Sequence, residues 1–99
     1  MATLHVLSHS PFADTRLTSC LRMLGPADGL LLSGDAVYAL SPSSSPWQTL
    51  QERLGSDRLF VLEEDMSARN IQTPTGVTAV DYPGFVALSV RFDRVNSWL

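Results

Sequence analysis

Apolar residues recur with two different periods along the chain, and the alternation between them predicts an α/β fold. Four short apolar runs are typical of strands: residues 3–8, 29–33, 59–62 and 77–80. The run at 29–33 is almost wholly apolar, which is typical of a strand buried on both faces of a sheet. Segments with helical spacing separate these runs.

The first helical segment carries Leu17, Cys20, Leu21 and Leu24 at i, i+3, i+4 and i+7. Asp14 precedes this stripe and is predicted to be the N-cap. The stripe predicts one apolar helix face that packs against the sheet.

A polar loop at residues 41–46 precedes the second predicted helix. Ser45 is the expected cap, with Pro46 at the first position and Gln48 three residues after the cap. Gly55 is expected to end this helix. Two shorter helical segments are predicted at 36–40 and at 63–70.

Residues 85–92 fit either a strand or a helix. Apolar side chains alternate at even positions from 86 to 92, as in a strand, but Asp81 can cap a helix that has Pro83 in its first turn. The alternation of elements along the whole chain favours the helix. A last short strand is expected at 95–99.

The elements together predict one domain spanning residues 1–99. Its fold class is α/β: an open, mostly parallel sheet of four to five strands, with helices on both faces. Gly34 and Asp35 follow the second strand, where open α/β sheets usually hold ligands.

Composition narrows the functional classes. The 99 residues have a net charge of −3, and the seven basic residues, all Arg, are scattered. A nucleic-acid backbone is bound by clustered positive charge, so direct nucleic-acid binding is not expected. No apolar stretch approaches the ~20 residues that span a bilayer, and no signal sequence opens the chain. We therefore expect a cytoplasmic protein with no membrane association.

Cys20 is the only cysteine and the main candidate for chemistry. Two His and one Cys show no metal-ligand spacing, and no phosphate loop is present, so neither a metal nor a cofactor is expected. A reactive thiol needs a lowered pKa, and Arg16, one turn earlier, is a cation that could help. The apolar stripe instead favours Cys20 as a small core residue. Both interpretations stay open at this point.

Five blocks of sequence, in order along nearly the whole chain, resemble the DsrH/TusB family. They are LHVLSHSPF at 4–12, LLLSGDAVYA at 30–39, LFVLEEDMSAR at 59–69, VDYPGFV at 80–86 and SWL at 97–99. Two positions depart from the family pattern: Ala36 and Asn70 stand where glycine is usual. Both departures concern turn geometry.

The resemblance implies a sulfur-relay subunit of TusBCD/DsrEFH-type complexes. Such a subunit joins DsrE/TusD-like and DsrF/TusC-like partners in a heterohexamer, which passes persulfide sulfur to a TusE/DsrC-like carrier. In the Tus branch the sulfur goes to 2-thiolation of the tRNA wobble uridine. In the Dsr branch it serves dissimilatory sulfur oxidation.

The resemblance also bears on Cys20. The main sulfur-carrying cysteine of these complexes lies on the DsrE/TusD-like subunit, so the enzymatic status of this chain stays open. DsrH-type chains carry a cysteine in the helix after the first strand, at the position of Cys20. Cys20 is therefore a candidate auxiliary persulfide acceptor, and the alternative is a purely structural subunit with an inert thiol.

Overall fold

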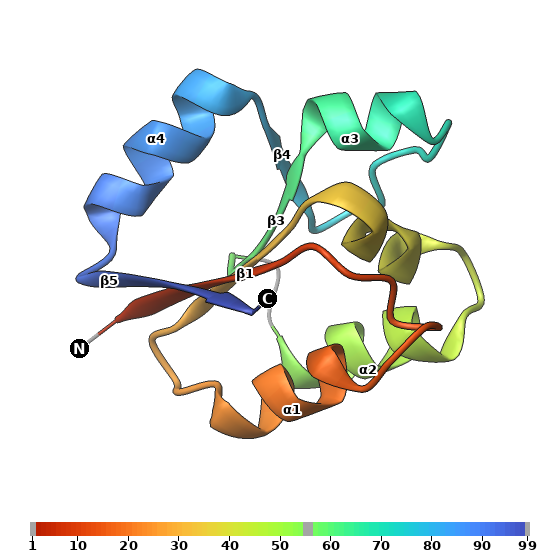
Figure 1. Ribbon diagram of the computed structural model, residues 1–99, viewed down its shortest axis with the longest axis horizontal. Helices are drawn as coiled ribbons and strands as arrows, with labels where there is room; N and C mark the ends of the chain where they lie inside the picture. The colour runs from red at the N-terminus through yellow and green to blue at the C-terminus, as the bar shows by residue number, and fades with distance from the viewer. Residues whose placement is uncertain (1, 55–56, 99) are drawn as a thin grey trace.

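A five-stranded parallel β-sheet forms the centre of the computed structural model, which describes residues 2–54 and 57–98 (Figure 1). The strands are β1 (Thr3–Leu7), β2 (Gly29–Leu32), β3 (Leu59–Leu62), β4 (Thr78–Val80) and β5 (Arg94–Trp98). They lie in the order β4-β3-β2-β1-β5. Strands β2, β3 and β4 thus follow one another on one side of β1, and β5 lies on the other side of β1.

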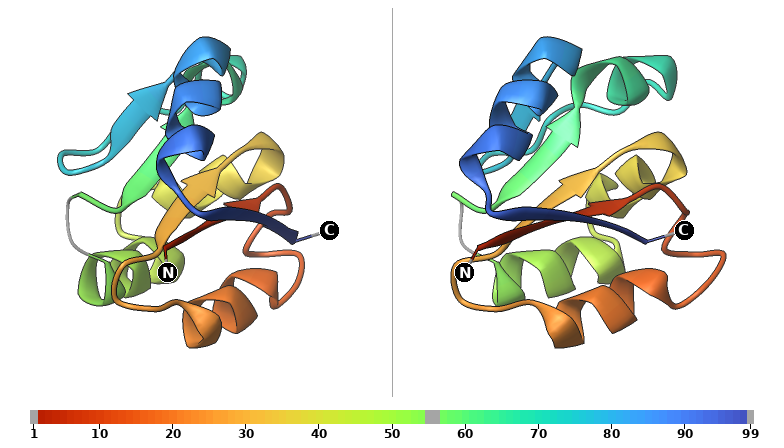
Figure 2. Two further views of the ribbon diagram at one scale, coloured as in Figure 1. Left: turned by 90° about the vertical axis from the view of Figure 1, so that its left-hand side faces the viewer. Right: turned by 60° about the vertical axis from the view of Figure 1, so that its left-hand side comes forward.

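Helices cover both faces of the sheet, which confirms the predicted architecture (Figures 1 and 2). They are α1 (Arg16–Met23), the 3₁₀ helix η1 (Gly34–Leu40), α2 (Ser45–Arg53), α3 (Glu63–Ala68) and α4 (Tyr82–Arg91). Helices α1 and α2 lie on one face and α4 lies on the other. Connections between neighbouring parallel strands are right-handed. The connection from β4 to β5 runs across the sheet in the opposite direction to the earlier ones, so its helix, α4, lies on the opposite face.

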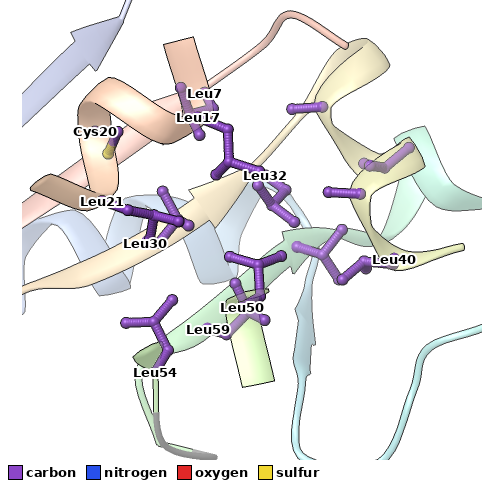
Figure 3. Packing of buried hydrophobic residues seen from close by; sticks show 14 of the residues in the cluster. Leu7, Leu17, Cys20, Leu21, Leu30, Leu32, Leu40, Leu50, Leu54 and Leu59 are labelled. Carbon is purple, nitrogen blue, oxygen red and sulfur yellow. The ribbon is translucent and has the colours of Figure 1, made fainter. Parts of the chain in front are cut away.

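The core has two layers, one on each face of the sheet. The larger layer contains leucines of α1, α2 and the strands, together with Cys20 (Figure 3). The smaller layer lies beneath α4 and contains Leu4, Leu31, Phe60, Leu62 and Leu88. Strand β2 contributes Leu30 and Leu32 to the first layer and Leu31 to the second, which explains its continuous apolar run.

The predicted N-caps of α1 and α2 are wrong by one residue each. Helix α1 begins at Arg16, and Asp14 accepts a hydrogen bond from the Arg16 backbone N–H at 3.0 Å rather than capping the helix. An aspartate side chain that accepts from the backbone N–H two residues later forms an Asx turn, and here this turn precedes the helix. Helix α2 is capped by Ser44, whose hydroxyl accepts from the Trp47 N–H at 3.2 Å. Ser45 is already helical, so it cannot serve as the cap.

The ambiguous segment at 85–92 is helical, as favoured. Asp81 caps α4 by accepting from the Gly84 N–H at 2.8 Å, and Pro83 lies in the first turn. The last strand is confirmed as β5 over its described part. The predicted end of α2 at Gly55 and the predicted last strand residue, Leu99, fall outside the described residues.

The two departures from the family's glycine pattern have different structural settings. Asn70 follows α3 with φ of +54°, in the left-handed region that glycine favours and asparagine tolerates better than most residues. Ala36 lies inside η1 with an ordinary negative φ, so glycine is not required there.

Candidate functional site

Cys20 lies in the middle of α1 with its side chain buried beside Leu17 and Leu21 (Figure 3). The residue is 0% exposed. Burial raises the pKa of its thiol to about 12, and the negative charge of Asp28 adds to the effect. Arg16, which could have lowered this pKa, pairs with Asp14. Cys20 is therefore a neutral thiol at ordinary pH in this conformation, and a neutral thiol is a poor nucleophile.

A buried polar network lies on the same face of the sheet as α1. It joins three side chains from distant parts of the sequence: His5 of β1, Asp28 just before β2, and Trp98 of β5. His5 is 5% exposed and Asp28 is 7% exposed. No motif or spacing in the sequence indicated this network. A histidine in an apolar strand and an aspartate beside a doubly buried strand were the available signals.

The hydrogen bonds of the network define the tautomer of the neutral His5 ring. The Trp98 indole N–H donates to His5 Nδ1 at 3.1 Å, and an indole nitrogen is only ever a donor. Nδ1 must then carry a lone pair. The proton of the neutral ring is on Nε2, which lies 3.2 Å from Asp28 Oδ2 and donates to it. This assignment follows from the partners of each nitrogen.

Asp28 is the structural centre of the network. Its carboxylate accepts from the Gly25 N–H at 2.8 Å and from the Thr3 N–H at 2.9 Å, as well as from His5. Burial acts to raise the pKa of Asp28, but these three hydrogen bonds outweigh burial and lower it. The guanidinium of Arg58 donates to the backbone oxygens of Asp28 and Gly25. The loop before β2 is thereby tied to both β1 and β3.

The carboxyl ends of β2 and β3 are joined by a second polar cluster. The Gly34 N–H donates to Asp65 Oδ2 at 2.8 Å, and Asp35 accepts two hydrogen bonds from Arg69. The Arg69 guanidinium also lies 5.9 Å from the centre of the Tyr38 ring. Gly34 and Asp35, the candidates for ligand binding, are thus bonded to Asp65 and Arg69, and these contacts connect η1 to α3.

Within residues 2–54 and 57–98, His, Cys, Asp and Glu side chains form no group of three that could hold a metal ion. None of the helices there is both long and apolar enough to cross a membrane.

Comparison with known proteins places the chain in a family. The family described as "DsrH like protein" matches residues 9–95. The chain is 36% identical over 98 residues to Protein TusB of Enterobacter sp. (strain 638), covering 96% of this chain and 99% of the relative. It is 34% identical over 97 residues to Protein TusB of Yersinia pestis (strain Pestoides F), with the same coverage of both chains.

A solved structure supports the fold independently. The crystal structure of the YchN protein from E. coli matches with a TM-score of 0.73, covering 99% of this chain and 100% of that one. Sequence identity is 16%, so this likeness concerns the fold alone. The family match and the TusB relatives both extend over nearly the whole length, and the chain therefore belongs to the DsrH/TusB family.

Proposed function

We propose that the chain is a subunit of a sulfur-relay complex that acts in 2-thiolation of the tRNA wobble uridine. The observation that carries the proposal is the match to TusB proteins along nearly their full length. The burial of Cys20 agrees with a role as a partner subunit rather than as a stand-alone enzyme, because the chain presents no thiolate of its own.

The proposed assembly is a cytoplasmic heterohexamer with two copies each of this chain, a DsrE/TusD-like subunit and a DsrF/TusC-like subunit. It hands sulfur to a TusE/DsrC-like carrier. Helix α4 has exposed apolar side chains at Tyr82, Val86 and Val90, which recur every four residues and so form one stripe. An apolar stripe on a small domain is consistent with a chain that works inside an assembly.

The proposed chemistry is persulfide transfer. The thiolate of an acceptor cysteine attacks the outer sulfur of a donor persulfide. The donor S–S bond breaks, the donor cysteine leaves as a thiolate, and the acceptor becomes the new persulfide. We assign the main donor and acceptor steps to cysteines of the partner subunit and the carrier.

Two roles for Cys20 are compatible with this scheme. As an auxiliary persulfide acceptor, Cys20 would need α1 to move so that its thiol becomes accessible and can ionise. As an inert core residue, it would need no such movement. Full burial and a pKa of about 12 support the inert role.

A second candidate function is favoured by the family description itself, which is that of DsrH-like proteins. In this alternative the same assembly serves dissimilatory sulfur oxidation, and tRNA thiolation does not depend on it.

Affinity purification from the native host tests the proposal. The chain, tagged at its N-terminus, is expressed from its own locus and purified under mild conditions, and bound proteins are identified by mass spectrometry. We expect two related small α/β subunits in equal amounts with the tagged chain. Recovery of the tagged chain as a clean monomer contradicts the proposal.

A further inference from the structure

His5 lies between one donor and one acceptor, and only its neutral form satisfies both. Nδ1 accepts from the Trp98 indole, and Nε2 donates to Asp28. A second proton can bind the ring only at Nδ1, where it would face the indole N–H. Two donors would then oppose each other, so protonation removes the hydrogen bond to Trp98. The bond to Asp28 remains and becomes charge-assisted.

A surface hollow of about 380 Å³ borders the network and is lined by His5, Asp28, Met23, Arg94 and Asn96, among others. The hollow gives water a route to the imidazole.

Among the described residues, the charged side chains that line this hollow with His5 are Asp28, from the loop before β2, and Arg94 of β5. Arg58 approaches the same loop and donates to the backbone oxygens of Asp28 and Gly25. The Cys20 thiol of α1 senses the Asp28 charge. The strand partner on the β2 side is the apolar Leu30. Asp28 accepts from His5 Nε2, and the Trp98 N–H faces Nδ1.

The Trp98 hydrogen bond matters because β5 is an edge strand. Within the described sheet, β5 pairs only with β1. Trp98 packs against the core layer that contains Cys20, and its indole is tilted 40° to the His5 ring at 6.2 Å between centroids. The end of β5 is thus held by backbone pairing to one neighbour, by Trp98 packing and by the bond to His5.

We propose that His5 is a proton-sensitive latch for the carboxyl-terminal strand. Neutral His5 holds Trp98 against the core, and protonated His5 releases its indole and loosens the end of β5. The proposal depends only on contacts within this chain, so the outcome of its test neither supports nor contradicts the sulfur-relay function.

Nitrogen-15 NMR of the full-length chain tests the latch. The indole N–H of Trp98 and the ring nitrogens of His5 are followed between about pH 8 and 5, the range in which histidine ordinarily titrates. We expect the Trp98 signal to shift with the same midpoint as His5. Its protection against solvent exchange, taken relative to a free indole N–H at the same pH, should fall roughly fivefold, as expected for the loss of one neutral hydrogen bond. Trp47, which belongs to α2, is the internal control and should not respond.

Three variants separate the latch from a general effect of acid. His5→Gln should make the Trp98 signal independent of pH, whereas His9→Gln, which changes the other histidine, should leave the response intact. Trp98→Phe keeps His5 but removes the indole N–H, so the protection of the β5 backbone amides should no longer depend on pH. Trp98→Phe decides the question if His5→Gln does not fold.

Several outcomes would overturn the proposal. They are a Trp98 signal that stays constant while His5 titrates, a His5 ring that protonates only on global unfolding, a pH response that persists in His5→Gln, and a β5 amide protection that still depends on pH in Trp98→Phe.

Discussion

At the scale of single residues, Cys20 shows how the fold controls the chemistry of a side chain. Its position on an apolar helix stripe predicted a core residue, and its position in the family predicted a sulfur acceptor. The structure buries it completely and raises the pKa of its thiol to about 12. Any sulfur transfer to Cys20 therefore requires a conformation other than the one described here.

The first prediction concerns the ionisation of Cys20. Its ordinary pKa of 9.0 applies to the unfolded chain, and its folded value is about 12. Below pH 9 both states keep the proton, so stability is unaffected. Between about pH 9 and 12 the unfolded chain loses the proton and the folded chain does not, so the free energy of unfolding should decrease. Urea unfolding at increasing pH measures this decrease.

Cys20→Ala is the control for that measurement, because tyrosines also titrate at high pH. The variant should show a shallower decrease in stability with pH than the wild-type chain. The Cys20 thiol should also react with a thiol reagent far more slowly in the folded chain than in urea. Equal labelling rates in the two states would show that the thiol is accessible and would contradict its burial.

At the scale of secondary structure elements, helix boundaries depend on which side chain reaches which backbone N–H. Ser44 and Ser45 are adjacent and chemically identical, and the sequence pattern favoured Ser45 as the cap of α2. The structure assigns the cap to Ser44, whose backbone is extended and whose hydroxyl accepts from Trp47. Ser45 is the first helical residue.

These two serines offer a matched pair of substitutions. Ser44→Ala should lower the free energy of unfolding by about 1 kcal/mol, because the Trp47 N–H loses its acceptor at the helix start. Ser45→Ala should have little effect, since no cap bond depends on its hydroxyl. Thermal or urea unfolding of the two variants checks the difference. A larger loss of unfolding free energy for Ser45→Ala than for Ser44→Ala would show that Ser45 is the cap.

The elements were largely predictable because local spacing determines them. The doubly buried strand at Leu30–Leu32 and the cap at Asp81 were both predictable from neighbouring residues. The predicted caps Asp14 and Ser45 are each one residue away from the observed N-caps, Thr15 and Ser44, because several small polar residues compete for the same role.

The candidate site was less predictable because it depends on contacts between distant residues. His5 was recognised as a strand residue, but its partners Asp28 and Trp98 lie 23 and 93 positions away in the sequence. The contact with Trp98 exists only because β5 returns to the open side of β1, where Leu7 pairs with Trp98. No local pattern specifies that return.

At the scale of the whole molecule, the fold is a scaffold with its polar groups largely satisfied internally. Within residues 2–54 and 57–98, buried side-chain nitrogen and oxygen atoms all have hydrogen-bond partners. Its one cysteine is buried, and the carboxyl ends of β2 and β3 are joined by paired side chains. These features agree with a chain that contributes surfaces to an assembly and leaves the sulfur chemistry to its partners.

The most direct test of this account is the 2-thiouridine content of tRNA in the native host, measured by mass spectrometry of nucleosides. Three strains are compared: one lacking the gene for this chain, the same strain carrying the wild-type gene, and the same strain carrying Cys20→Ala. We expect thiolation to be lost in the first strain and restored in both others, because the chain completes the complex without a reactive thiol of its own. Failure of Cys20→Ala to restore thiolation, with the complex intact, would make Cys20 part of the relay. Unchanged thiolation in the strain lacking the gene would contradict the central claim.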